Sequence, residues 1–104
     1  MKEFKIIIES LARQDMIELR RYISKTLKEP IIAKRIYESI KSAILTLDLN
    51  PERHAVVRDE PYASLGLRRL FAENYIAFYL VDNQEKEVRV IRVLYNRREW
   101  HNLL

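Results

Sequence analysis

Arginines gather in the C-terminal third of this sequence, among apolar and aromatic residues. From Arg89 onward the chain holds four arginines and His101 against a single acid, Glu99. A guanidinium group is planar and grips phosphate or carboxylate through two parallel hydrogen bonds, whereas a lysine ammonium acts as a point charge. The pattern therefore favours a site that binds an acidic partner such as nucleic acid.

Three arginines interrupt segments that otherwise read as strands. Arg68 and Arg69 lie inside the apolar segment 67–71, and strict strand alternation places Arg92 on one face with Val88, Val90 and Leu94. An unpaired charge on a buried face would cost several kcal/mol, so Arg92 must reach an acid or the rim of the sheet. A salt-bridged or snorkelling arginine explains any single case equally well. Together with Arg97 and Arg98, a functional cluster is the better explanation.

Tyrosines and a histidine near these arginines could supply stacking or proton transfer. Tyr75, Tyr79 and Tyr95 lie on or beside the same strands, where they could stack on bases or, beside cations, ionise. For Tyr79, core packing is the stronger interpretation. Histidine is the residue type whose near-neutral pKa best suits proton transfer in RNA cleavage, so His101 could serve there, although it could equally pair with a helix dipole. We expect His54 to be solvated in a loop.

Several other chemistries find no support in the sequence. There is no cysteine, and the two histidines are far apart, so no metal-ligand spacing exists. Gly66 is the only glycine, which excludes a phosphate-cradling glycine loop, and the serines lack a nucleophile-elbow motif. We therefore expect a site without metal or cofactor.

The elements that must position these residues follow from apolar periodicity. Residues 4–8 predict a strand, and two apolar stripes at helical spacing, Ala12 to Leu27 and Ala33 to Leu47, predict two helices separated by Pro30. After a loop at 49–64 with a brief strand at 55–57, residues 67–71, 75–81 and 88–95 predict three antiparallel strands. Asn96 can then cap a short helical turn over 97–103. The expected fold class is α+β, with an antiparallel helix hairpin packed on one face of an antiparallel sheet and a short C-terminal helical tail.

Composition sets the broad class of the protein. The chain of 104 residues is 48% hydrophobic and 33% charged, which predicts a single globular domain over residues 1–104. Nineteen Lys and Arg against fifteen Asp and Glu give a net charge of +4, which favours nucleic acid or an acidic protein as partner. The N-terminal apolar run is too short for a signal peptide or a membrane span. We expect a cytoplasmic protein that does not bind membranes.

Three segments, in chain order, follow a known family pattern. The first is FKIIIES at 4–10, with Ala12, Asp15, Tyr22 and Ile23 after it and Asn50-Pro51 where the second helix ends. The second runs from GLRRL at 66–70 through NYIAFY at 74–79, and the third, the most specific, is RVLYNRREW at 92–100. Together they span nearly the whole chain and resemble the RelE/ParE superfamily, the toxins of type II toxin-antitoxin systems.

The resemblance implies a toxin that a cognate antitoxin wraps and neutralises, and it implies one of two targets. RelE-like members cleave messenger RNA in the ribosome, whereas ParE-like members poison DNA gyrase. In the RNA-cleaving branch an arginine usually follows the tyrosine of the central hairpin, but here Ile76 follows Tyr75. Against this, Arg68 and Arg97 fall on positions that the family uses for basic residues.

On this balance we rank ribosome-dependent mRNA cleavage slightly ahead of gyrase inhibition. Arg68 and Arg97 would stabilise the scissile phosphate, and Tyr95 or His101 would move protons. The residues expected to bind nucleic acid are Arg69, Arg92, Arg98 and Tyr75. The expected partners are the antitoxin and either the ribosome with mRNA or DNA gyrase. A non-enzymatic module that binds through the same patch is the third alternative.

Overall fold

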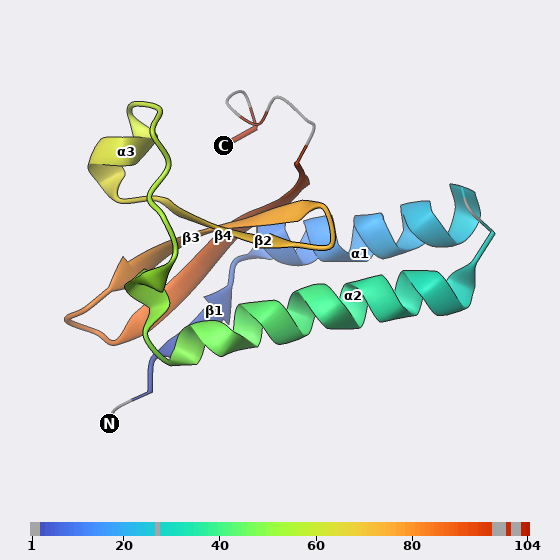
Figure 1. Cartoon of the computed structure of the whole chain (residues 1–104), viewed down its shortest axis with the longest axis horizontal. Helices are drawn as coiled ribbons and strands as arrows, with labels where there is room; N and C mark the ends of the chain where they lie inside the picture. Colours follow the sequence, from blue (N-terminus) through green and yellow to red (C-terminus); the bar gives the residue numbers. More distant parts are fainter. Residues whose placement is uncertain (1–2, 27, 97–99, 101–102) are drawn as a thin grey trace.

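Two long helices lie side by side beneath a twisted sheet in the computed structural model, which describes residues 3–26, 28–96, 100 and 103–104 (Figure 1). The principal elements are β1 (Lys5–Ile8), α1 (Ser10–Thr26), α2 (Pro30–Leu45), β2 (Arg68–Ala72), β3 (Tyr75–Asp82) and β4 (Glu87–Tyr95). This order confirms the predicted α+β fold. None of the described helices is long and apolar enough to cross a membrane.

The sheet has the strand order β1-β4-β3-β2. The three C-terminal strands form the predicted antiparallel meander. β1 joins it in parallel, with Lys5 opposite Glu87 and Ile8 opposite Val90, so the sheet is mixed. The chain leaves β1 through the helix hairpin and the meander follows. Its last strand, β4, lies beside β1 and runs parallel to it.

The two helices cover one face of the sheet. This helix-covered face holds the larger hydrophobic core. α1 contributes Ala12, Met16, Leu19 and Ile23, which follow one another at the spacing predicted for an amphipathic helix. α2 begins at Pro30, after the N-cap residue Glu29, where the sequence predicted a break, because proline suits the first turn of a helix. Buried residues of α2, of the 3-10 turn after it and of the sheet complete this core: Ala33, Ile40, Ile44, Leu47, Leu70, Ala77, Tyr79, Val88, Val90 and Val93.

The opposite face carries a smaller core, covered by the short helix α3 (Tyr62–Leu65) and by the C-terminal end of the chain (Figure 1). Its buried residues are Val57, Leu67, Ile76, Phe78 and Leu94. The Trp100 ring packs against Phe78, with ring centroids 5.0 Å apart. The helical turn predicted over 97–103 lies largely outside the described residues. Within the described part, the Leu103 N–H donates to the Trp100 carbonyl at 2.9 Å.

The loop at 49–64 is more ordered than the sequence predicted. A short 3-10 turn, Thr46–Asp48, precedes it; the loop itself contains a second 3-10 turn, Pro51–Arg53, and then the start of α3. The brief strand predicted at 55–57 is a single antiparallel bridge between Val56 and Arg68. The Tyr79 hydroxyl donates to the Pro51 carbonyl at 2.6 Å, which ties the loop to the sheet.

A β-bulge in β4 changes which side chains share a face. Phe78 pairs with Arg92, but its neighbour Tyr79 pairs with Val90, so Ile91 is an extra residue without a direct partner. An extra residue reverses the alternation of side chains beyond it. The prediction from strict alternation was therefore wrong for Val88 and Val90, which lie in the core under the helices, but right for Leu94, which lies with Arg92 on the opposite face.

Candidate functional site

Arg68 begins β2 and reaches back to the preceding loop. Its Nη1 donates to the carbonyl oxygens of Glu52 (3.0 Å) and His54 (2.6 Å). Its Nη2 lies 3.6 Å from the Glu52 carboxylate, a long ion pair whose acidic side chain is 50% exposed. The guanidinium therefore holds the loop in place, while its Nη2 side faces an acid that solvent can reach.

Arg92 sits at the bulge and connects three parts of the fold. Its Nε and Nη2 donate to the two carboxylate oxygens of Asp15 on α1, at 2.8 and 2.9 Å, and its Nη1 donates to the Leu103 carbonyl. The Val93 N–H also donates to Asp15, at 2.9 Å. The hydrogen bond to Asp15 raises the pKa of Arg92 above its usual range. A phosphate would have to displace Asp15 to reach this guanidinium.

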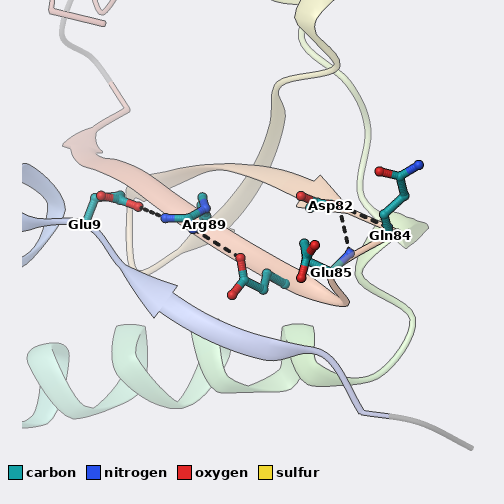
Figure 2. Close-up of polar contacts among 6 residues, drawn as sticks. Glu9, Asp82, Gln84, Glu85 and Arg89 are labelled. Atoms are coloured by element: carbon teal, nitrogen blue, oxygen red, sulfur yellow. Dashed lines mark hydrogen bonds and ion pairs between the residues drawn. The ribbon is translucent and has the colours of Figure 1, made fainter.

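Arg69 and Arg89 lie on the opposite face from the helices. The Arg69 guanidinium carbon lies 5.5 Å from the Phe71 ring centroid, and its Nε is buried without a hydrogen-bond partner. Arg89 is bound on both sides, to Glu9 at 2.7 Å and to Glu87 at 3.1 Å (Figure 2). The hydrogen bond to Glu9 is the main cause of its raised pKa. Arg89 thus has carboxylate partners already.

Figure 2 also shows how the neighbouring turn between β3 and β4 is built. The Asp82 carboxylate accepts the backbone N–H groups of Gln84 and Glu85, both at 3.0 Å. Such an Asx turn fixes the hairpin through local hydrogen bonds. Acidic side chains therefore lie beside Arg89 near the turn between β3 and β4. The charge at this end of the sheet is mixed.

Tyr75 and Tyr95 lie opposite each other on β3 and β4. Their ring centroids are 5.4 Å apart at an interplanar angle of 69°. The pKa of Tyr75 is raised, mainly by burial and to a smaller extent by the neighbouring Tyr95 and Tyr22. The expectation that nearby cations would favour a phenolate therefore does not hold for Tyr75, whose hydroxyl keeps its proton.

The described strands do not bring Arg68 and Tyr95 together. Arg68 pairs with Tyr79, whereas Tyr95 pairs with Tyr75, four residues away along β3. At the rise of a strand this separates them by about 13 Å. Arg97, Arg98 and His101, which were also predicted at the site, lie outside the described residues. The catalytic and nucleic-acid-binding roles stay predictions.

His54 is less solvated than predicted. It is partly buried, its Nε2 has no hydrogen-bond partner, and its ring meets Tyr79 edge-on at 6.3 Å. Burial, then the charges of Arg53 and Arg68, lower the pKa of His54. The surroundings of His54 therefore disfavour the charged imidazolium form.

Sequence reasoning missed a groove of about 680 Å³ between α1 and the ends of β3 and β4. We call it the tyrosine groove; its lining residues include Tyr22, Tyr75 and Tyr95. The available signal was Tyr22, a large aromatic residue off the apolar stripe of α1, which is 64% exposed. A helical pattern predicts only that such a residue faces away from the core.

Comparison with known proteins places this geometry in context. Residues 6–100 match the family model described as the ParE toxin of the type II toxin-antitoxin system parDE. A comparison with curated protein sequences gives no match.

Solved structures share the fold across most of their length. The chromosomal ParDE toxin-antitoxin system of Pseudomonas aeruginosa aligns with a TM-score of 0.72 and 20% identity, covering 89% of this chain and 96% of that one. The toxin-antitoxin complex RelBE2 of Mycobacterium tuberculosis aligns with a TM-score of 0.67 and 19% identity, covering 89% and 98%. An archaeal RelE-RelB complex from Pyrococcus horikoshii aligns with a TM-score of 0.63 and 17% identity, covering 92% and 98%. At these identities the likeness concerns the fold.

Proposed function

This chain belongs to the ParE toxin family of type II toxin-antitoxin systems, and we propose that it inhibits growth by binding and poisoning DNA gyrase until a cognate antitoxin covers it. The family model spans nearly the whole chain. The gyrase target follows the ParE-like branch of the resemblance described above. The antitoxin partner is in keeping with the solved relatives, which are toxin-antitoxin systems or complexes.

The state of the arginines carries the choice of target. Metal-free RNA cleavage needs cations free to meet the phosphate and a proton-transfer group beside them. In the described part of the chain, Arg92 is paired with Asp15, and Arg68 is separated from Tyr95 by the length of half a strand. A toxin that inhibits gyrase by binding to it does not need free cations and a proton-transfer group at one site. These observations support gyrase over mRNA as the target.

Ribosome-dependent mRNA cleavage is the second candidate, and one observation favours it. The Arg68 Nη2 meets Glu52 only at 3.6 Å, and the Glu52 side chain is half exposed. A phosphate could therefore replace this carboxylate without dismantling a buried ion pair. In that mechanism Arg68 and Arg97 bind phosphate, and Tyr95 or His101 transfers the proton.

Two assays on the purified toxin separate these candidates. We expect the toxin to block supercoiling of relaxed plasmid by gyrase and ATP while a cell-free translation reaction proceeds normally. Primer extension on ribosome-bound mRNA should then show no new 5′ ends. New 5′ ends together with normal supercoiling would contradict the gyrase target.

An Arg68 variant sharpens the same comparison. We expect Arg68→Gln to leave gyrase inhibition intact, whereas the nuclease mechanism requires it to abolish cleavage. Arg58→Gln is the matched control, because Arg58 is an exposed arginine of the same region. Urea denaturation of both variants would show whether a lost effect reflects the site or the loss of the hydrogen bonds from Arg68 to the loop.

A further inference from the structure

The positive charge of the chain is concentrated on its helix hairpin. Residues 10–45 hold eight Lys and Arg against four Asp and Glu, and the rest of the chain holds eleven of each sign. The surplus of the hairpin, eight minus four, therefore equals the net charge of +4 of the whole protein. A surplus confined to one part of the fold directs that part toward an acidic partner.

Five exposed cations follow the seam between α1 and α2, which lie side by side (Figure 1). On α1, Arg13 and Arg20 are seven residues apart, which is about two helical turns. On α2, Lys34 and Lys41 have the same separation, with Tyr37 between them. The Arg20 guanidinium carbon lies 5.4 Å from the Tyr37 ring centroid, so the two rows face each other across the seam. We call this set the hairpin stripe: Arg13, Arg20, Arg21, Lys34 and Lys41.

Carboxylates do not neutralise the hairpin stripe. Its five side chains form no ion pair in the part of the chain that the structure describes. Arg35, on the neighbouring face of α2, shows the contrast, because it is bound to Glu73 at 3.3 Å. The acids nearest to the stripe in sequence are Glu18, which accepts from the Gln14 amide at 3.3 Å, and the exposed Glu38. The stripe therefore presents uncompensated positive charge to solvent.

The shape of the hairpin stripe fits a nucleic-acid backbone. At 1.5 Å per residue, the 16 residues of α2 extend about 24 Å, along which each strand of a duplex places about seven phosphates. Exposed lysines and arginines spaced along such a rod supply the attraction to phosphate that does not depend on base sequence. Tight binding of an acidic protein would instead require apolar anchors in a desolvated pocket. The groove that offers such a pocket, the tyrosine groove, has acids in its lining.

We propose that the hairpin stripe binds the phosphate backbone of duplex DNA. The inference goes beyond the proposed function, which needs only a protein surface, and it rests on that function for the choice of DNA over RNA. The Arg20 guanidinium, packed on the Tyr37 ring, is held at the centre of the stripe, with the lysines of α2 on either side of that ring. In this arrangement the sheet stays available to the protein partner while the helices hold the DNA.

Fluorescence anisotropy of the purified toxin with a short labelled DNA duplex of mixed sequence tests the stripe without gyrase. The stripe variant Arg21→Gln/Lys41→Gln removes one exposed cation from each helix. We expect it to bind the duplex at least about 10-fold more weakly than the wild type at about 0.1 M salt. The slope of log affinity against log salt should also become shallower by about two, because two fewer phosphates are neutralised.

Lys5→Gln/Arg58→Gln is the matched control, because it removes the same two residue types from exposed positions outside the hairpin. It should bind within about twofold of the wild type, since charges farther from the duplex than the Debye length are screened. Urea denaturation should give the wild-type midpoint for both variants. If the stripe variant is unstable, Lys34→Gln/Lys41→Gln carries the same expectation.

Three results would overturn the proposal. The first is an equal loss for the stripe variant and the control, because net charge alone would then explain the binding. The second is a wild-type toxin that does not bind the duplex, or whose binding does not weaken with salt. The third is tighter binding to an RNA duplex of the same sequence or to polyglutamate, which would assign the stripe to a different class of partner.

A supercoiling assay separates this inference from the proposed function. With gyrase as the target, the stripe variant should require more toxin than the control for the same inhibition, and the difference should shrink as the salt concentration rises. A wild-type toxin that leaves supercoiling intact would refute the gyrase target. The anisotropy comparison between the stripe variant and the control would still decide whether the hairpin binds DNA.

Discussion

The two faces of the sheet are built differently. The helix-covered face is a continuous apolar layer, in which α1 and α2 bury side chains across all four strands. The opposite face has a smaller core around Phe78, covered by α3 and the C-terminal end, with Arg69 and Arg89 beside it. This difference indicates that the helices supply most of the burial, whereas the second face depends on specific hydrogen bonds and ion pairs to stay ordered.

The strongest test of this comparison is Asp15→Ala, which removes the link between the faces. The side chains of Asp15 and Arg92 are only 12% and 18% exposed. Breaking such a pair leaves a charge without its partner, and we expect a loss of about 3–5 kcal/mol in the free energy of unfolding. Urea denaturation followed by circular dichroism would measure it.

A paired replacement gives the control for this change. Asp15→Leu/Arg92→Met removes both charges together and should cost much less than Asp15→Ala alone, because no unpaired group remains. Equal unfolding midpoints for Asp15→Ala and the wild type would show that the faces are not coupled through this pair.

Truncations on each face come next in expected size. Ile44→Ala, at a fully buried position under the helices, should cost about 2–5 kcal/mol. Trp100→Ala should cost less, about 1–2 kcal/mol, because the side chain is only partly buried against Phe78. Unfolding by urea measures both, and a larger loss for Trp100→Ala would reverse the ranking of the two faces.

The smallest expected effect is a pH dependence at the loop end of the helix-covered face. The fold lowers the pKa of His54 below its ordinary value of 6.5, so the unfolded chain takes up the proton first as the pH falls. The contribution of His54 to stability is present above about pH 6.5 and is lost as the pH drops toward the lowered pKa. Thermal unfolding at pH 7.5 and 5.5 should show a larger drop for the wild type than for His54→Gln. Identical drops would mean that folding does not change the pKa of His54.

Local patterns were enough to predict most of the fold. The apolar stripes of both helices and the β-rich segments are short-range signals, so α1, α2 and the meander matched closely. The bulge at Ile91 was not predictable, because it depends on how β4 aligns with β3. Nor was the pairing of Arg92 with Asp15, which lie 77 residues apart in the sequence.

The candidate site was predicted less completely for the same reason. Residue types showed that Arg92 needed an acid or the rim, and the structure supplies the acid. They could not show that Arg68 and Tyr95 would be held apart, or that three elements would enclose the tyrosine groove. These distances support the proposed gyrase target over mRNA cleavage.

The carboxylate of Asp15 has one more consequence, at the border of the sheet. Beyond Val90, β4 has no neighbouring strand on its β1 side in the described part of the chain, and the Val93 N–H there is capped by Asp15. A bulge and an inward-pointing charge are devices that keep open strands from recruiting others. The same side chain that secures Arg92 therefore occupies a backbone donor that an added strand would need.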